Sequence, residues 1–178
     1  NAVNLSMKEA SEIVKENPLV EFGSVAIAER HVKKGNEHMN MMRKQNYGSK
    51  FFITQGIFDP AAIIKLLNDY DKLCKELDVE PRKVILTFAP CGREKTMQFI
   101  KWLGMTVPEA VEKRIFSKKT PNLSEGERDL GPVRESCNIL EEVLQEVRNL
   151  SWSLGVNISL GSRRLLVSWA LKSATITL

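Results

Sequence analysis

The chain has 178 residues, of which 43% are apolar and 27% are charged, a balance typical of a globular protein and not of a disordered one. Its 26 basic and 22 acidic residues leave a net charge of +4, too small an excess to predict the dense basic surface of a nucleic-acid-binding protein. The longest apolar runs fall far short of the roughly 20 residues that a membrane span requires, so no membrane segment is expected.

Helix caps, prolines and the spacing of apolar residues predict the helices. Ser6 can cap the first helix, and Asn17-Pro18 ends it because a proline disfavours helical geometry in the residue before it. The most strongly patterned helix starts at Asp59-Pro60 and ends near Asp78. Further helices are expected at residues 36–48, 94–103, 107–116 and 133–154.

Runs of branched and aromatic apolar residues predict four strands, at residues 19–28, 50–55, 83–89 and 156–160. Strands and helices alternate, and the near-continuous apolar runs are typical of parallel strands buried on both faces. The sequence therefore predicts a single α/β domain over residues 1–178, with a polar surface loop at residues 117–129. Two architectures fit: a four-stranded doubly wound sheet, or about four βα units of a parallel (β/α) barrel of TIM type, which needs about 250 residues.

The cysteines and histidines show no spacing that predicts a disulfide framework or a metal site. Cys74, Cys91 and Cys137 form no CxxC pair, which favours a reducing, cytoplasmic compartment and buried packing roles. His31 and His38 stand seven residues apart with no carboxylates clustered in the sequence around them, so no metal is expected.

Polar residues at the predicted strand ends are the candidates for ligand binding, because ligands of parallel α/β folds lie at the carboxyl ends of the strands. His31 follows the first strand and could hold a phosphate, a ring heteroatom or a moving proton, or simply be a solvated loop histidine. Gln55 ends the second strand, and its amide could recognise the edge of a heterocycle or satisfy a loop backbone. Arg43 and Lys44 lie in the last turn of a helix, where the macrodipole alone favours cations.

Several short runs share the order and spacing of one enzyme family. The most specific is FITQ at residues 52–55 followed by Phe58-Asp59, downstream of Glu29-x-His31. Other similar runs are residues 26–31 (AIAERH), 34–38 (KGNEH), 44 (K), 67–70 (LNDY), 87–92 (TFAPCG), 95–96 (KT), 101–104 (KWLG) and 107–108 (VP). Over roughly residues 1–157 the chain resembles the methylenetetrahydrofolate reductase family.

The resemblance implies a (β/α)₈ barrel that binds FAD and passes reducing equivalents from NADH or NADPH to 5,10-methylenetetrahydrofolate, giving 5-methyltetrahydrofolate in one-carbon metabolism. This chain would supply the second half of that barrel. His31 would contact the flavin, and Gln55 would hydrogen-bond the folate pterin. The catalytic acid would lie upstream of Asn1, so the chain is expected to begin inside a larger fold. The ribityl, phosphate or adenosine portions of FAD would be held by Glu37, Asn40, Arg43 and Lys44.

The sequence also departs from the family. Ile27 and Ala28 stand where members often carry an aromatic residue and a proline, and residues 158–178 form an atypical terminus. Half a barrel has two open sheet edges, which favour homo-oligomers or other association. Two alternatives are therefore a noncatalytic, truncated member that associates with a full-length reductase, and a compact nucleotide-binding module unrelated to folate.

Overall fold

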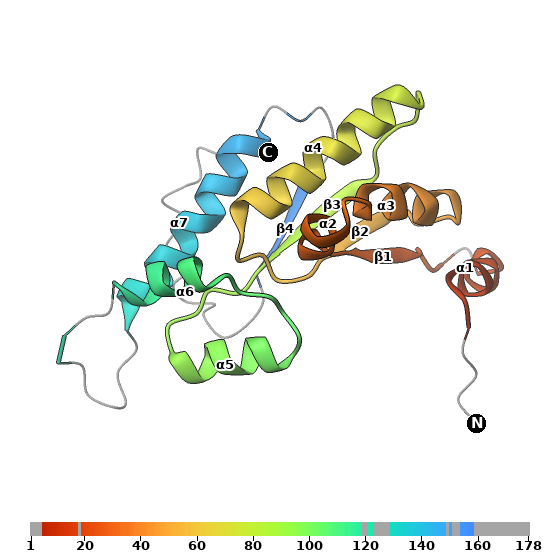
Figure 1. The fold of residues 1–178 in the computed structure, drawn as a ribbon. Coiled ribbons are helices and arrows are strands. Elements are labelled where there is room, and N and C mark those ends of the chain that lie inside the picture. Colours follow the sequence, from red (N-terminus) through yellow and green to blue (C-terminus); the bar gives the residue numbers. More distant parts are fainter. Residues whose placement is uncertain are drawn as a thin grey trace.

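A parallel four-stranded sheet forms the centre of the molecule (Figure 1). The computed structural model describes residues 5–17, 19–118, 121–122, 129–148, 150 and 154–158. The strands are β1 (Gly23–Ala26), β2 (Phe51–Thr54), β3 (Lys83–Phe88) and β4 (Leu154–Ile158). They lie in the order β1-β2-β3-β4 with every neighbouring pair parallel, which confirms the predicted α/β fold.

The strand order bears on the choice between the two predicted architectures. A doubly wound sheet reverses its strand order at a switch point, whereas consecutive units of a barrel add strands in chain order. The order here has no reversal, and β1 and β4 are both edges within the described residues. The sheet is consistent with part of a (β/α) barrel.

Seven helices occur in the described part of the chain, and local signals account for the start of several of them. The hydroxyl of Ser6 accepts the N–H of Glu9, whose carboxylate accepts the Ser6 N–H, so a capping box starts the first helix. The Asp59 carboxylate accepts the backbone N–H groups of Ala61 and Ala62, and so caps the helix that was expected to start at Asp59-Pro60. The helices are α1 (Met7–Lys15), α2 (Ala28–Lys34), α3 (Glu37–Asn46), α4 (Pro60–Glu76), α5 (Glu94–Trp102), α6 (Glu109–Phe116) and α7 (Leu130–Val147).

The predicted first strand, residues 19–28, is wrong in its bounds. Only Gly23–Ala26 pairs with β2, and Leu19 is 92% exposed. Ala28 begins helix α2, which the sequence analysis did not predict and which contains His31. Its residues are mostly good helix formers, and Gly35 ends it at a φ of 67°.

The last helix and strand also begin earlier than predicted. Helix α7 starts at Leu130 instead of residue 133, because the Asp129 carboxylate caps it by accepting the N–H of Gly131. It ends at Val147 instead of residue 154, because Leu154 already belongs to β4. The atypical terminus after Ile158, and most of the loop predicted at residues 117–129, lie outside the described residues.

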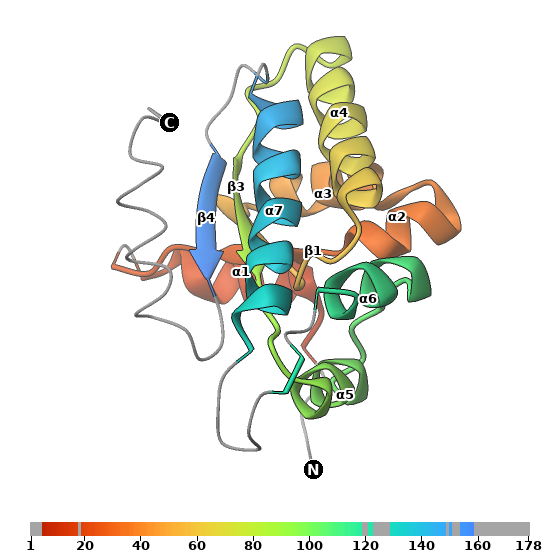
Figure 2. The same cartoon turned by 90° about the vertical axis from the view of Figure 1, so that its left-hand side faces the viewer.

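Helices α2, α3, α4 and α7 cover one face of the sheet. Figures 1 and 2 show α2, α3, α4 and α7 together on that side, where they pack on alternate strand residues such as Phe52, Val84 and Leu86. On the other face Val25 is 53% exposed and Ile53 is 38% exposed. The prediction that the strands are buried on both faces is therefore wrong for the described part of the fold.

Helices α5 and α6 build a second apolar cluster beyond the carboxyl end of β3 (Figure 1). Arg114 of α6 binds Glu135 and Glu142 of α7, which fixes α6 on that helix. Within the ranges that the structure describes, no helix combines the length and the apolar character required to span a membrane.

Candidate functional site

Gln55 lies at the carboxyl end of β2, where the sequence analysis placed it. Its backbone N–H donates to the carbonyl of Ala26 at 3.1 Å, so the β1–β2 ladder extends one residue beyond the strand. Strand residues alternate between faces, and Gln55 therefore shares the open face of the sheet with Phe51 and Ile53. Its half-buried amide stands at the rim of that face.

Thr87 is a polar residue of the same face that the sequence analysis did not select. The register pairs Ile53 with Ile85, so Gln55 and Thr87 come next on their strands. The Thr87 hydroxyl oxygen is buried and has no hydrogen-bond partner among the described residues. A buried hydroxyl without a partner is uncommon, which singles out Thr87 as a second polar residue of the face that Gln55 shares. The signal in the sequence is one polar residue near the end of an apolar strand.

Helix α3 carries a polar cluster whose centre is Glu37. The Glu37 side chain is fully buried, and its Oε2 accepts the side-chain amide of Asn40 at 3.1 Å. Arg30 Nη1 lies 3.6 Å from Oε2, and Lys44 Nζ lies 3.6 Å from Oε1. The side chain of Arg43 donates to Asn40 Oδ1 at 3.0 Å. The fold thus gathers four of the predicted residues, and it adds Arg30.

Lys44 connects this cluster to the sheet. Its ammonium group donates to the carbonyl oxygen of Val25 at 2.6 Å. Val25 precedes Ala26, the residue whose carbonyl accepts the N–H of Gln55. The α3 cluster and Gln55 therefore flank the carboxyl end of the same strand. The cluster holds three cationic side chains and one carboxylate: Arg30 and Lys44 lie beside Glu37, and Arg43 binds Asn40. This excess of positive charge makes the cluster electrostatically suited to an anion.

His31 does not lie in this cluster. Its imidazole is 1% exposed, and Nε2 makes a 2.7 Å hydrogen bond with Oδ2 of Asp69 on α4. The ring also packs edge-on against His38 of α3, with the centroids 5.0 Å apart. The described contacts of the His31 ring are thus with side chains of α3 and α4. No carboxylates cluster in the sequence around the two histidines. The fold supplies one from a distant position, Asp69, which was not predicted.

Two acidic side chains lie in the segments that follow β1 and β2. Burial raises the pKa of Glu29, and the negative charge of Asp59 raises it further. The Asp59 carboxylate is engaged as the cap of α4. A carboxyl group with a raised pKa therefore stands just beyond the end of β1, in the first turn of α2.

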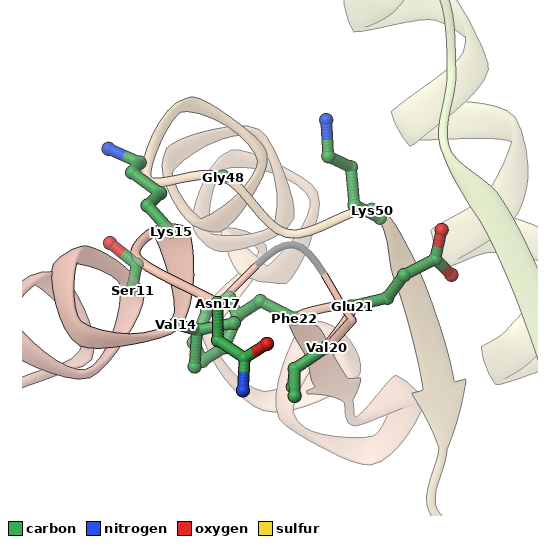
Figure 3. Close-up of a pocket in the computed structure, with 9 residues that line it drawn as sticks. All are labelled: Ser11, Val14, Lys15, Asn17, Val20, Glu21, Phe22, Gly48 and Lys50. Carbon is green, nitrogen blue, oxygen red and sulfur yellow. The ribbon is translucent and has the colours of Figure 1, made fainter.

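A cavity of about 310 Å³ lies at the opposite end of the strands. Figure 3 shows it between the end of α1 and the segments that precede β1 and β2, with Lys15 and Lys50 on separate sides. Its charged groups do not converge on one point. The cavity is therefore not the binding face that the carboxyl ends of the strands predict.

The three cysteines are free and buried. Burial is the main cause that raises the pKa of the thiols of Cys74, Cys91 and Cys137, which disfavours the reactive thiolate form. These observations confirm the packing roles expected for them.

Comparison with known proteins adds a functional lead. No protein-family model matches the sequence, and no curated protein matches it. Among solved structures, an uncharacterized protein from Clostridium thermocellum that binds two copies of 5-methyl-5,6,7,8-tetrahydrofolic acid matches with a TM-score of 0.73 and 31% sequence identity. This chain shares its fold with a folate-binding protein. The match covers 96% of this chain and 58% of that one, so the chain spans little more than half of the longer protein.

Proposed function

We propose that the chain binds a reduced folate at the carboxyl ends of its strands. The observation that carries the proposal is the similarity, over 96% of the chain, to a protein that binds 5-methyltetrahydrofolic acid. The open sheet face supports it, because Ile53 and Val25 offer apolar contact while Gln55 and Thr87 offer polar groups at one end. A pterin is a flat heterocycle with donors and acceptors along its edge, and a side-chain amide can pair with both kinds of group.

The finer proposal is a reductase of the methylenetetrahydrofolate type that uses FAD with NADH or NADPH. The α3 cluster fits a dinucleotide: Arg30, Arg43 and Lys44 supply charge for the phosphates. The Oε1 atom of Glu37 is buried without a hydrogen bond and could accept one from a hydroxyl of the ribityl chain. When bound, FAD would supply hydride transfer. The residues of this chain would hold the cofactor and orient the folate, while the catalytic acid is assigned to no residue here.

Folate titration tests the proposal. We expect the 178-residue chain to bind 5-methyltetrahydrofolate, measured by calorimetry, and the variant Gln55→Leu to bind it about 5- to 150-fold more weakly. That range corresponds to the loss of two hydrogen bonds of about 0.5–1.5 kcal/mol each. Gln98→Leu, at an exposed glutamine of α5, is the matched control and should bind normally.

The outcomes test folate binding and FAD binding separately. No binding by the unaltered chain would refute the folate function, and normal binding by Gln55→Leu would refute the role of Gln55. FAD titration is read independently by flavin fluorescence. Arg43→Met should weaken FAD, whereas Arg93→Met, an exposed arginine elsewhere, should not. Equal losses in both arginine variants would contradict the assignment of the α3 cluster.

The open face of the sheet favours a second candidate function, noncatalytic association with a full-length reductase. Exposure of Val25 and Ile53 on a parallel strand pair is unusual, because parallel sheets are normally covered on both sides. Co-purification with an intact reductase would support this candidate. A chain that stays monomeric in the presence of the reductase would exclude it.

A further inference from the structure

Three helices bring two histidines and a carboxylate together on the helical side of the fold. His31 comes from α2, His38 from α3 and Asp69 from α4. One nitrogen from each ring and one carboxylate oxygen all lie within 4.8 Å of one another. Asp69 lies more than 30 positions from either histidine in the sequence, and the packing of α2 and α3 on α4 brings it to them.

The hydrogen bonding of the two rings is incomplete. The Nδ1 atoms of His31 and His38 are both buried, and neither has a hydrogen-bond partner among the described residues. His31 is 99% buried, since its exposed fraction is 1%. Burying a polar ring nitrogen without a partner costs free energy, so a purely structural histidine pair would leave this cost uncompensated.

We propose that His31, His38 and Asp69 form a binding site for a divalent transition metal ion such as Zn²⁺. Two imidazole nitrogens and one carboxylate oxygen are a common ligand set for zinc, and three protein ligands leave a fourth position for water or another group. The site shares no residue with Gln55 or the α3 cluster, and so goes beyond the folate and FAD proposals. It also gives His31 a role other than a flavin contact.

The present geometry is close to what the ion requires. Zinc binds nitrogen and oxygen at about 2.0–2.2 Å, which places tetrahedral ligand atoms roughly 3.3–3.5 Å apart. Here the three ligand atoms all lie within 4.8 Å of one another, and His31 Nε2 lies 2.7 Å from Asp69 Oδ2. Side-chain adjustments on the order of 1 Å therefore suffice, given the ligand distances above. Asp69 is 32% exposed, which gives the ion a route from solvent.

One of the surrounding charges competes with a metal ion for this site. The competitor is Lys65, because its ammonium group lies 2.6 Å from the same Asp69 oxygen that bonds His31. A metal ion would have to displace that ammonium group. Removing Lys65 should therefore strengthen binding.

Zinc titration of the untagged, chelator-treated chain tests the site, with Co²⁺ as a spectroscopic substitute. We expect one bound ion per chain and visible absorption bands of four-coordinate cobalt. His38→Gln and Asp69→Asn should each weaken binding by about tenfold or more, the least effect expected when a direct ligand is lost. Lys65→Met should strengthen it several-fold. Circular dichroism and thermal melting establish that each variant is folded.

Helix α4 offers a matched control. Lys75 pairs with Asp71 at 2.6 Å and the same four-residue spacing as Lys65 and Asp69, but no histidine belongs to that pair. Lys75→Met and Asp71→Asn should therefore leave zinc affinity unchanged. Absence of stoichiometric zinc binding, or equal affinities for folded Asp69→Asn and the unaltered chain, would overturn the proposal. Either result would leave the folate titration unaffected.

Discussion

Replacing Tyr70 by phenylalanine should destabilise the fold by an amount that the structure allows us to work out. Tyr70 lies on α4 and is fully buried. Its hydroxyl donates to Oε1 of Gln45 at 2.5 Å and accepts the backbone N–H of Arg82 at 3.0 Å. It thus connects α4 with α3 and with the segment that leads into β3.

The magnitude follows from the groups that Tyr70→Phe leaves behind. The ring keeps its edge-on packing on Phe52, so little apolar burial is lost. The Gln45 oxygen, in a side chain that is 9% exposed, loses its partner at a cost of about 1–3 kcal/mol. The N–H of half-buried Arg82 can bond water and adds less. A total of about 2–3 kcal/mol corresponds to a fall in Tm of roughly 5–10 °C for a chain of this size.

Urea unfolding followed by circular dichroism, together with calorimetry, measures this loss. The midpoint should fall while the m value stays constant, because the surface exposed on unfolding hardly changes. Tyr47→Phe is the control: it removes the hydroxyl of a half-buried tyrosine and should change stability by no more than about 0.5 kcal/mol. Equal small losses in the two variants would refute the reasoning, since they would show that the Tyr70 hydrogen bonds contribute little.

Two further predictions concern pH and close packing. Because the folded pKa of Glu29 is raised, its contribution to stability is present at low pH and is lost as the pH rises through that value. Glu29→Gln should therefore raise Tm at about pH 7 with a gain that vanishes toward about pH 4, unlike exposed Glu21→Gln; a gain independent of pH would contradict this. Alanine normally stabilises a helix relative to glycine, but a Cβ at Gly131 would overlap the carbonyl oxygen of Lys118. Gly131→Ala should lower stability by about 1–3 kcal/mol in thermal melts, and a rise would show that this contact is absent.

Local signals explain which parts of the fold could be predicted. The starts of α1 and α4 follow from Ser6 and from Asp59-Pro60, because a cap acts within one turn of the helix it begins. The region of residues 19–28 was predicted wrongly, because an apolar run does not reveal how much of it a neighbouring strand will pair. Only Gly23–Ala26 pair with β2, and Ala28, the last residue of the predicted strand, belongs to helix α2.

The candidate sites divide in the same way. Glu37, Asn40 and Lys44 recur at helical spacing, so their grouping on one face of α3 follows from the sequence. Asp69 reaches His31 across 38 positions of the chain, because α2 packs on α4. No local pattern specifies such a contact. The same holds for Thr87, which is singled out by the pairing of β2 with β3 and by a hydroxyl left without a partner among the described residues.

The strand order β1-β2-β3-β4 has a consequence for how the protein is made. Among the four described strands, each one after β1 pairs with the strand synthesised just before it, so none of them has to insert between two earlier ones. During translation, each new strand that leaves the ribosome can therefore pair with the exposed edge of the strand before it. The sheet can therefore grow in one direction as the chain lengthens, and loss of β4 would remove a pairing at one edge while leaving the β1–β2 and β2–β3 ladders in register.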